Sequence, residues 1–165
     1  MTTADRWRSL CAGFDQRVAE VTDWDAPAPC EGWVARDVVD HLVAWVPAFL
    51  RMEPAADWPA VRDAVQAVLD DPLRADAVVS SQAGDHRFED AVAQFVLADV
   101  LVHTWDLARS NGLDERLDPD ETAYFLSAMQ PADEMMRGEH FGPKVAVSDD
   151  ADDVTKLIAF TGRHP

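Results

Sequence analysis

The chain has 165 residues and a formal net charge of −17, because 31 acidic side chains outnumber 14 basic ones. This charge argues against a nucleic-acid partner and against docking on anionic membranes, since both of these partners need basic residues on the protein. Hydrophobic residues make up 48% of the sequence, so the composition predicts one globular domain over residues 1–165 that buries its own core.

The first half of the chain is predicted to be helical, with one proline-rich loop. Apolar residues at helical spacing predict a helix over Thr3–Val21, followed by an extended loop over Trp24–Gly32. A second main helix is expected over Val34–Ala48. A shorter helix is expected to begin at Asp57-Trp58-Pro59 and to end near Asp70, with proline in its first turn.

Two further main helices are predicted in the second half. One covers Phe88–Ser110 and ends at Asn111-Gly112, and the other covers Asp118–Arg137 with a kink at Pro131. Three shorter elements are also expected: a strand at Ala77–Ser80, a strand at Lys144–Val147 and a terminal helix at Ala151–Phe160. The pattern predicts a mostly α fold built on a helix bundle.

The sequence also predicts a cytoplasmic protein. Residues Met1–Arg6 lack the basic region and apolar run of a signal peptide, and no uncharged apolar stretch of about 20 residues is present. The two cysteines, Cys11 and Cys30, fit a reducing compartment better than a disulfide framework.

Polar side chains interrupt the apolar stripe of the predicted helix over 88–110. At 100° per residue, Asp99, His103 and Asp106 fall in or beside this stripe, and Asp99 and His103 are four residues apart. His41 borders the apolar face of the helix over 34–48 in the same way. Two packed helices would bring His41, Asp99 and His103 to one point, as two imidazole ligands and one carboxylate ligand of a divalent metal.

A site without metal remains open at this stage. An Asp–His hydrogen bond can satisfy both groups, and a core histidine often donates to a backbone carbonyl. Helical spacing alone does not distinguish these interpretations.

Two motifs and the chain end resemble a known family. Residues 24–42 include Pro29-Cys30-Glu31-Gly32-Trp33 and His41-Leu42, which resemble the PCxGWxxxDxxxHL segment of the DinB/YfiT-like superfamily. Residues 99–109 resemble the E/D-x3-HxWDLA helix of the branch that contains the metal-binding domain of mycothiol-dependent maleylpyruvate isomerase. The end, from Phe141-Gly142-Pro143 to Thr161-Gly162-Arg163-His164-Pro165, resembles the FG…TGRxP ending of small stand-alone members.

The resemblance implies a DinB-like four-helix bundle with up-down-down-up topology, short extra helices and room for a small two-stranded element. It implies a divalent metal, Zn²⁺ first and Ni²⁺ or Fe²⁺ as alternatives, with ligands at His41, Asp99 and His103. It also implies activation of a low-molecular-weight thiol such as mycothiol, in an S-transferase or isomerase reaction on a small-molecule substrate.

Two departures from the isomerase stand out. Its acidic ligand is glutamate, whereas Asp99 is one methylene shorter, and its second, C-terminal domain has no counterpart in a sequence of this length. Maleylpyruvate isomerisation itself is therefore not implied. A metal-activated-water hydrolase and a non-catalytic metal-binding or interaction bundle remain alternatives, and the chain is expected to be a monomer or a homodimer.

Other residues are weaker candidates for the site. Asp106 is expected either to orient a ligand histidine or to pair with an arginine. Trp33 and Trp105 are candidates for a pocket wall or for the core, and Arg109 and His140 are candidate catalytic groups. Structural ion pairing of Arg109 and a solvated loop position for His140 are the alternatives.

Overall fold

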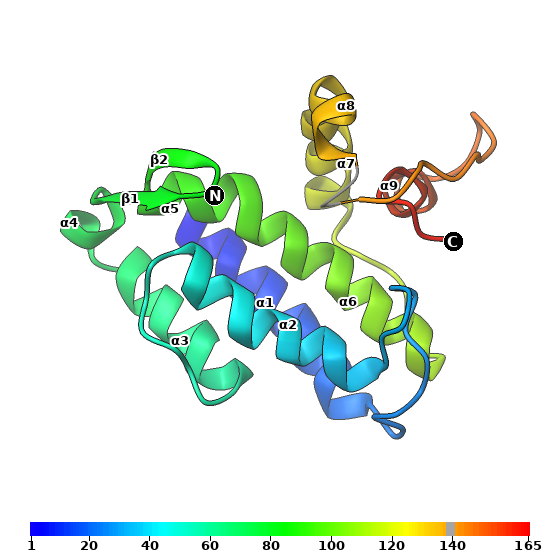
Figure 1. The fold of residues 1–165 in the computed structure, drawn as a ribbon, viewed down its shortest axis with the longest axis horizontal. Coiled ribbons are helices and arrows are strands. Elements are labelled where there is room, and N and C mark those ends of the chain that lie inside the picture. Colours follow the sequence, from blue (N-terminus) through cyan, green and yellow to red (C-terminus); the bar gives the residue numbers. More distant parts are fainter. Residues whose placement is uncertain (138–140) are drawn as a thin grey trace.

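Four helices form an up-down-down-up bundle. The computed structural model describes residues 1–137 and 141–165. The bundle consists of α1 (Thr3–Glu20), α2 (Ala35–Phe49), α3 (Trp58–Leu69) and a long helix made of α5 (Phe88–Ala91), the π-helical turn η1 (Val92–Val96) and α6 (Leu97–Asn111). α1 and α6 run in one direction, and α2 and α3 run in the other (Figure 1). α6 packs against α1 and α2, and α3 packs against the same two helices.

Local sequence signals explain where these helices begin and end. Thr2 and Asp5 form a capping box at the start of α1, and the Asp57 side chain accepts a hydrogen bond from the backbone of Ala60 at the start of α3. The long helix ends at Gly112 in the left-handed conformation. The predicted bounds of the bundle helices agree with the structure to within one residue at each end.

α6 is the central helix of the core. Its residues from Leu97 to Ala108 are buried, with the exception of Asp99. The stretch Phe88–Asn111 is long and apolar enough to span a membrane by those criteria alone, but 78% of its most apolar window is buried inside the protein. It is therefore a core helix of the bundle.

A short β-hairpin follows α3 and α4 (Pro72–Ala75). β1 (Val78–Ser81) pairs antiparallel with β2 (Gly84–Arg87), in the register Val78 opposite Arg87. The strand predicted at 77–80 is thus confirmed with a shift of one residue. The prediction at Lys144–Val147 is wrong, because these residues form no strand; the backbone N–H of Val145 donates to the carbonyl of Ala159 instead.

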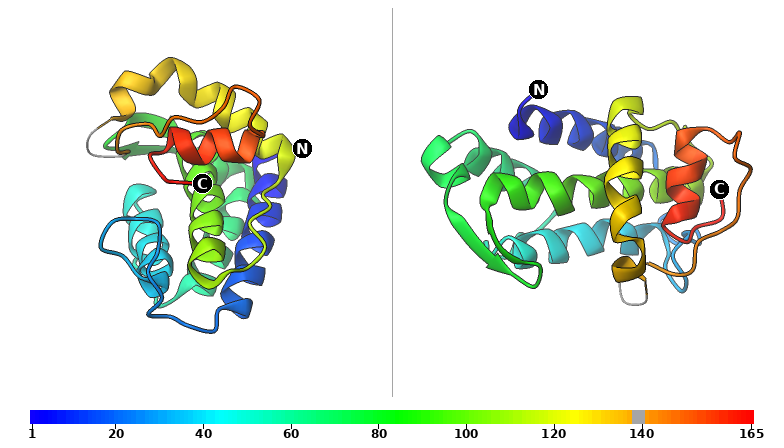
Figure 2. Two further views of the ribbon diagram at one scale, coloured as in Figure 1. Left: turned by 90° about the vertical axis from the view of Figure 1, so that its right-hand side faces the viewer. Right: turned by 90° about the horizontal axis from the view of Figure 1, so that it is seen from above.

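The C-terminal residues form a layer outside the bundle. The helix predicted over Asp118–Arg137 is divided into α7 (Pro119–Met129), the 3₁₀ turn η2 (Gln130–Ala132) and α8 (Asp133–Met136), because Pro131 cannot continue a regular ladder. α7 crosses α6 and packs against α9 (Asp153–Phe160) (Figure 2). The helix that completes the bundle is therefore the shorter one at 58–69, and the main helix predicted at 118–137 lies outside it.

Candidate metal centre

Three polar side chains from α2 and α6 converge at the surface between these helices. The Asp99 carboxylate lies between two imidazoles: its Oδ2 is 3.1 Å from Nε2 of His41, and its Oδ1 is 3.4 Å from Nε2 of His103. The potential ligand atoms of the three residues all lie within 4.8 Å of one another. The structure thus brings together the three residues that the helical spacing singled out.

The fold gives each of these side chains a different exposure. The side chain of His103 is 5% exposed because α6 is surrounded by the bundle, whereas the side chains of Asp99 and His41 are 25% and 27% exposed. One side of the cluster therefore faces the core and the other remains accessible to small molecules. A donor set of this kind leaves coordination positions for water or substrate.

Asp106 holds the His103 ring from the side opposite to Asp99. Nδ1 of His103 lies 2.8 Å from Oδ2 of Asp106, whose side chain is fully buried. Because a carboxylate only accepts, Nδ1 carries the hydrogen of this bond, so Nε2 is the nitrogen that would bind a cation after losing its own proton. The Arg163 guanidinium in turn donates to both carboxylate oxygens of Asp106, at 2.6 and 2.7 Å. The two roles considered for Asp106, orienting a histidine and pairing with an arginine, thus occur together.

The cluster favours a positive charge among its donors. Burial alone would lower the pKa of His103, but the charge of Asp99 and hydrogen bonds with Asp106 and Asp99 raise this pKa to about 9. Burial would raise the pKa of Asp99, yet the His103 charge and hydrogen bonds from both histidines hold this pKa well below its usual range. A divalent cation bound here would take the place of the His103 proton as the positive charge beside Asp99.

The loop before α2 covers one face of the site. Gly32, with φ of +77°, allows a tight turn in which the backbone N–H of Trp33 donates to the carbonyl of Cys30 at 3.0 Å. This turn places the Trp33 ring 5.8 Å from the His103 ring in a stacked geometry, and 5.2 Å from the ring of His41. Trp33 therefore forms a wall of the candidate site.

Cys30 belongs to a second cluster, with His103 and Asp106, that also has metal-ligand types. Nη2 of Arg163 lies 3.2 Å from the Cys30 Sγ, and this guanidinium already neutralises Asp106. Burial, together with the charge of Asp106, raises the pKa of Cys30 to about 12. A cation would meet the Arg163 charge here, so the first cluster is the better candidate.

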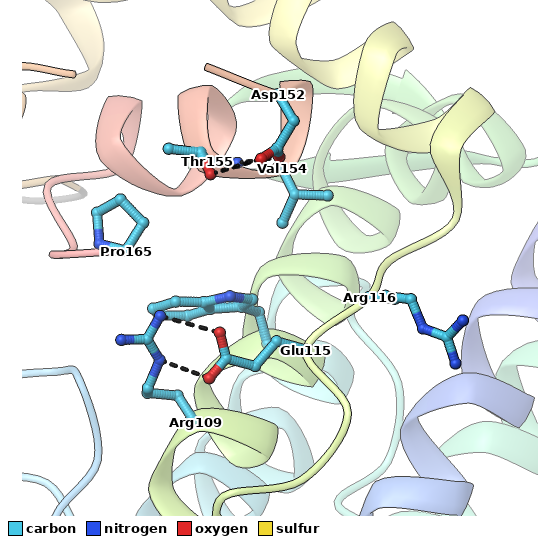
Figure 3. A pocket seen from close by; sticks show the side chains of 8 residues that line it. Arg109, Glu115, Arg116, Asp152, Val154, Thr155 and Pro165 are labelled. Atoms are coloured by element: carbon cyan, nitrogen blue, oxygen red, sulfur yellow. Dashed lines mark hydrogen bonds and ion pairs between the residues drawn. The ribbon is translucent and has the colours of Figure 1, made fainter. Parts of the chain in front are cut away.

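Trp105 and Arg109 lie in a different place. Trp105 is buried against Val102 and Ile158, and the Arg109 guanidinium lies 4.5 Å from the centre of its ring. Both residues line a separate pocket of about 340 Å³. Figure 3 shows Arg109 in this pocket, where it pairs with Glu115 through two contacts of 2.7 and 2.9 Å. The structure therefore separates both residues from the donor cluster. His140 lies outside the described residues.

Arg163 contacts the candidate site through Asp106, and the sequence patterns did not single it out. It lies beyond the last helix, so no helical periodicity places it near Asp106. Its only signal in the sequence is its position in the TGRxP ending.

The fold and the donors define a helical bundle with a candidate metal site between two of its helices. The sequence model of the mycothiol maleylpyruvate isomerase N-terminal domain matches residues 7–96 of the chain. The chain belongs to this family. Comparison with curated proteins and with solved structures finds no match.

The family match covers only part of the candidate site. It includes His41, Cys30 and Trp33, and it ends before Asp99 and His103. The choice of Asp99 and His103 as candidate ligands therefore rests on the geometry, which places them beside His41 in the matched part of the chain.

Proposed function

We propose that His41, Asp99 and His103 hold one divalent metal ion, with Zn²⁺ as the first choice and Ni²⁺ or Fe²⁺ as alternatives. The observation that carries the proposal is the convergence of these donors, with the far nitrogen of the buried His103 held by a carboxylate. Imidazole and carboxylate ligands fit these ions, and a histidine ligand commonly donates its other N–H to a carboxylate.

We further propose that the protein is an enzyme that activates a low-molecular-weight thiol of the mycothiol type, as an S-transferase or an isomerase. The family is named for a mycothiol-dependent isomerase domain, which supports a thiol substrate. A bound divalent ion would act as a Lewis acid and lower the pKa of a thiol that coordinates it.

The chain's own residues divide the remaining tasks. Asp106 bonds Nδ1 of His103 and so orients the ring, whose Nε2 would bind the metal. Trp33 forms a wall beside the site. Cys30 is a poor candidate for the reacting thiol, because burial and the charge of Asp106 raise its pKa and its Sγ contacts Asp106 and Arg163. Cys11 is buried, which raises its pKa, so the proposal takes the reacting thiol from a small-molecule cosubstrate.

Metal analysis tests the proposed site. The protein is reconstituted in turn with Zn²⁺, Ni²⁺ and Fe²⁺, desalted, and measured by elemental analysis. We expect about one equivalent in the parent protein and none after His41→Ala or His103→Ala. His86→Ala serves as the control, because His86 lies on β2 and its Nε2 lies 3.1 Å from the Ala83 carbonyl. Failure of all three ions to bind the parent protein would overturn the proposal.

A thiol-transfer assay separates the enzyme from a non-catalytic metal-binding bundle. Mycothiol and the electrophile monochlorobimane are mixed with the metal-loaded protein; the thiolate sulfur forms a bond to carbon and chloride leaves. The enzyme proposal expects acceleration that disappears in His103→Ala. Metal binding without acceleration of this or other thiol reactions would favour the alternative of a non-catalytic metal-binding bundle.

We also propose a cytoplasmic location and a monomeric or homodimeric state. In the part of the chain that the structure describes, Cys11 and Cys30 are free thiols, which suits a reducing compartment. Cell fractionation and light scattering test these two proposals.

A further inference from the structure

We infer that Arg163, at the end of the C-terminal layer, sets the strength of metal binding at His103 by holding Asp106. This inference rests on the proposed metal site. It makes Arg163 a positioning residue, because its effect on His103 passes through Asp106.

The contact between Arg163 and Asp106 is two-pronged and buried. Nε donates to Oδ1 at 2.6 Å and Nη2 donates to Oδ2 at 2.7 Å, while the two side chains are 10% and 0% exposed. A planar guanidinium fixes both the position and the rotation of a carboxylate in this geometry. Loss of the arginine would leave a buried carboxylate without its main counter-charge, which is strongly unfavourable.

The same carboxylate orients the proposed ligand. Oδ2 of Asp106 is shared between Nδ1 of His103 at 2.8 Å and Nη2 of Arg163, with the Cys30 Sγ at 3.6 Å. Any rotation of Asp106 therefore changes the hydrogen bond that fixes the His103 ring. Partners of this kind affect metal affinity although they do not touch the metal.

The turn that ends α9 places Arg163 in this position. The backbone N–H of Arg163 donates to the carbonyl of Ile158, and that of Gly162 donates to the carbonyl of Ala159, which is a Schellman motif. Gly162 has φ of +86°, and a Cβ at this position would lie 3.1 Å from the carbonyl oxygen of Pro143. Because Ile158 packs on Val102 of α6, the turn is held against the helix that carries His103.

The chain offers a matched control for this ion pair. Arg6 donates through Nε and Nη2 to the two carboxylate oxygens of Glu121, both at 2.6 Å, with side chains 15% and 6% exposed. This pair joins α1 to α7, so it also connects the bundle to the C-terminal layer. Arg6→Gln removes a contact of the same form and burial at a distance from the proposed ligands.

The test is the Zn²⁺ dissociation constant, measured by competition with a chromophoric chelator at fixed pH. We expect Arg163→Gln to weaken Zn²⁺ binding about 10-fold or more, in the range found for residues that orient metal ligands. Arg163→Lys should restore part of the affinity because it keeps the charge without the second prong. Arg6→Gln should bind Zn²⁺ as the parent does, even where its unfolding temperature falls.

A double variant tests whether Arg163 acts through Asp106. If it does, Asp106→Asn combined with Arg163→Gln should bind Zn²⁺ as weakly as Asp106→Asn alone, and no more weakly. Circular dichroism checks that each variant is folded, and Arg163→Lys replaces Arg163→Gln if the latter does not fold.

Several outcomes would overturn the inference. Parental Zn²⁺ affinity in folded Arg163→Gln, or an equal loss in Arg6→Gln, would show that Arg163 has no specific role at the site. Additive losses in the double variant would show that it does not act through Asp106. If the parent protein binds none of Zn²⁺, Ni²⁺ and Fe²⁺, the proposed function fails together with this inference. If the parent binds metal and Arg163→Gln binds it equally well, only this inference fails, so the two failures are distinguishable.

Discussion

His103 lies between two carboxylates, and its raised pKa has a consequence for stability. Nε2 faces Asp99 and Nδ1 faces Asp106, so the folded protein favours the imidazolium form in the absence of metal. The pKa is raised from 6.5 to about 9. The stabilising contribution of this group is therefore complete below pH 6.5 and is lost as the pH rises through about 9.

The first prediction is that the metal-free protein loses stability over this pH window. In the presence of a chelator, the unfolding temperature of the parent protein should fall between pH 6.5 and 9. His103→Gln, which cannot titrate, should show a flatter dependence. The same slope in both proteins would assign the effect to other groups.

The second prediction concerns the charge of Asp99. Asp99→Asn keeps the shape of the side chain but replaces one carboxylate oxygen by an NH₂ group and removes the negative charge. It should therefore weaken Zn²⁺ binding by at least about 10-fold. Chelator competition measures the change. Asp63→Asn, which removes an exposed carboxylate on α3, should leave the affinity unchanged.

Part of the site was predictable from residue types and spacing. Asp99 and His103 share a helical face, and this relation holds because both lie after the π-helical turn. Arg109 forms an ion pair with Glu115, which lies just past the end of α6. Helical spacing does not reveal a pair of this kind. Arg163 could not be placed, because its contact with Asp106 joins positions 57 residues apart through tertiary packing.

At the level of secondary-structure elements, the site depends on the loop before α2 and on the middle of that helix. The rings of Trp33 and Trp45 lie 5.2 and 5.9 Å from that of His41, and Trp45 stacks on it almost in parallel. Trp58 instead packs in the core against Trp7 and Phe14. The tryptophans near the proposed metal are therefore distinct from those of the core.

The third prediction follows from these ring positions. Binding of a paramagnetic ion such as Co²⁺ or Ni²⁺ should quench part of the tryptophan fluorescence, since quenching is effective only at short range. Trp33→Phe and Trp45→Phe should each reduce the quenched fraction, whereas Trp58→Phe should increase it by removing a distant emitter. Equal quenching in all three variants would place the ion elsewhere.

The fourth prediction concerns the turn after α9. Gly162→Ala should destabilise the protein more than Gly112→Ala, because both positions have positive φ but only Gly162 has backbone atoms within 4 Å of a new Cβ. Thermal unfolding measures this difference. Gly162→Ala should also weaken Zn²⁺ binding by displacing Arg163, and unchanged affinity would show that the turn does not position the arginine.

The helices were more predictable than the elements outside the bundle. Capping residues and apolar periodicity are local, so the bounds of α1, α2 and α3 follow from nearby residues. The packing role of each helix is not local. The helix at 58–69 completes the bundle although it is shorter than the region predicted as helix at 118–137, because burial depends on which faces meet.

On the scale of the whole molecule, the net charge of −17 is the dominant electrostatic feature. Many arginines already neutralise an acidic partner, as in the ion pairs of Arg6, Arg62, Arg87 and Arg163. The remaining acidic groups outnumber the basic ones and therefore repel one another across the surface. Such repulsion weakens as dissolved salt shortens its range.

The fifth prediction is stabilisation by simple salt. Raising NaCl from about 10 mM to about 150 mM reduces the Debye length from about 30 Å to about 8 Å and should raise the unfolding temperature. A chelator in both samples excludes trace metal as the cause. A fall in the unfolding temperature would show that attractive ion pairs outweigh the surplus repulsion.

The burial of α6 also constrains how such a protein can diverge in evolution. Substitutions along this helix alter the core and the donor set at once, so they are expected to be rare and to occur in compensated groups. The loop before α2 and the half-exposed residues of α2, by contrast, line the site without filling the bundle. Among relatives that share this architecture, we therefore expect more sequence variation in that loop and helix face than along α6.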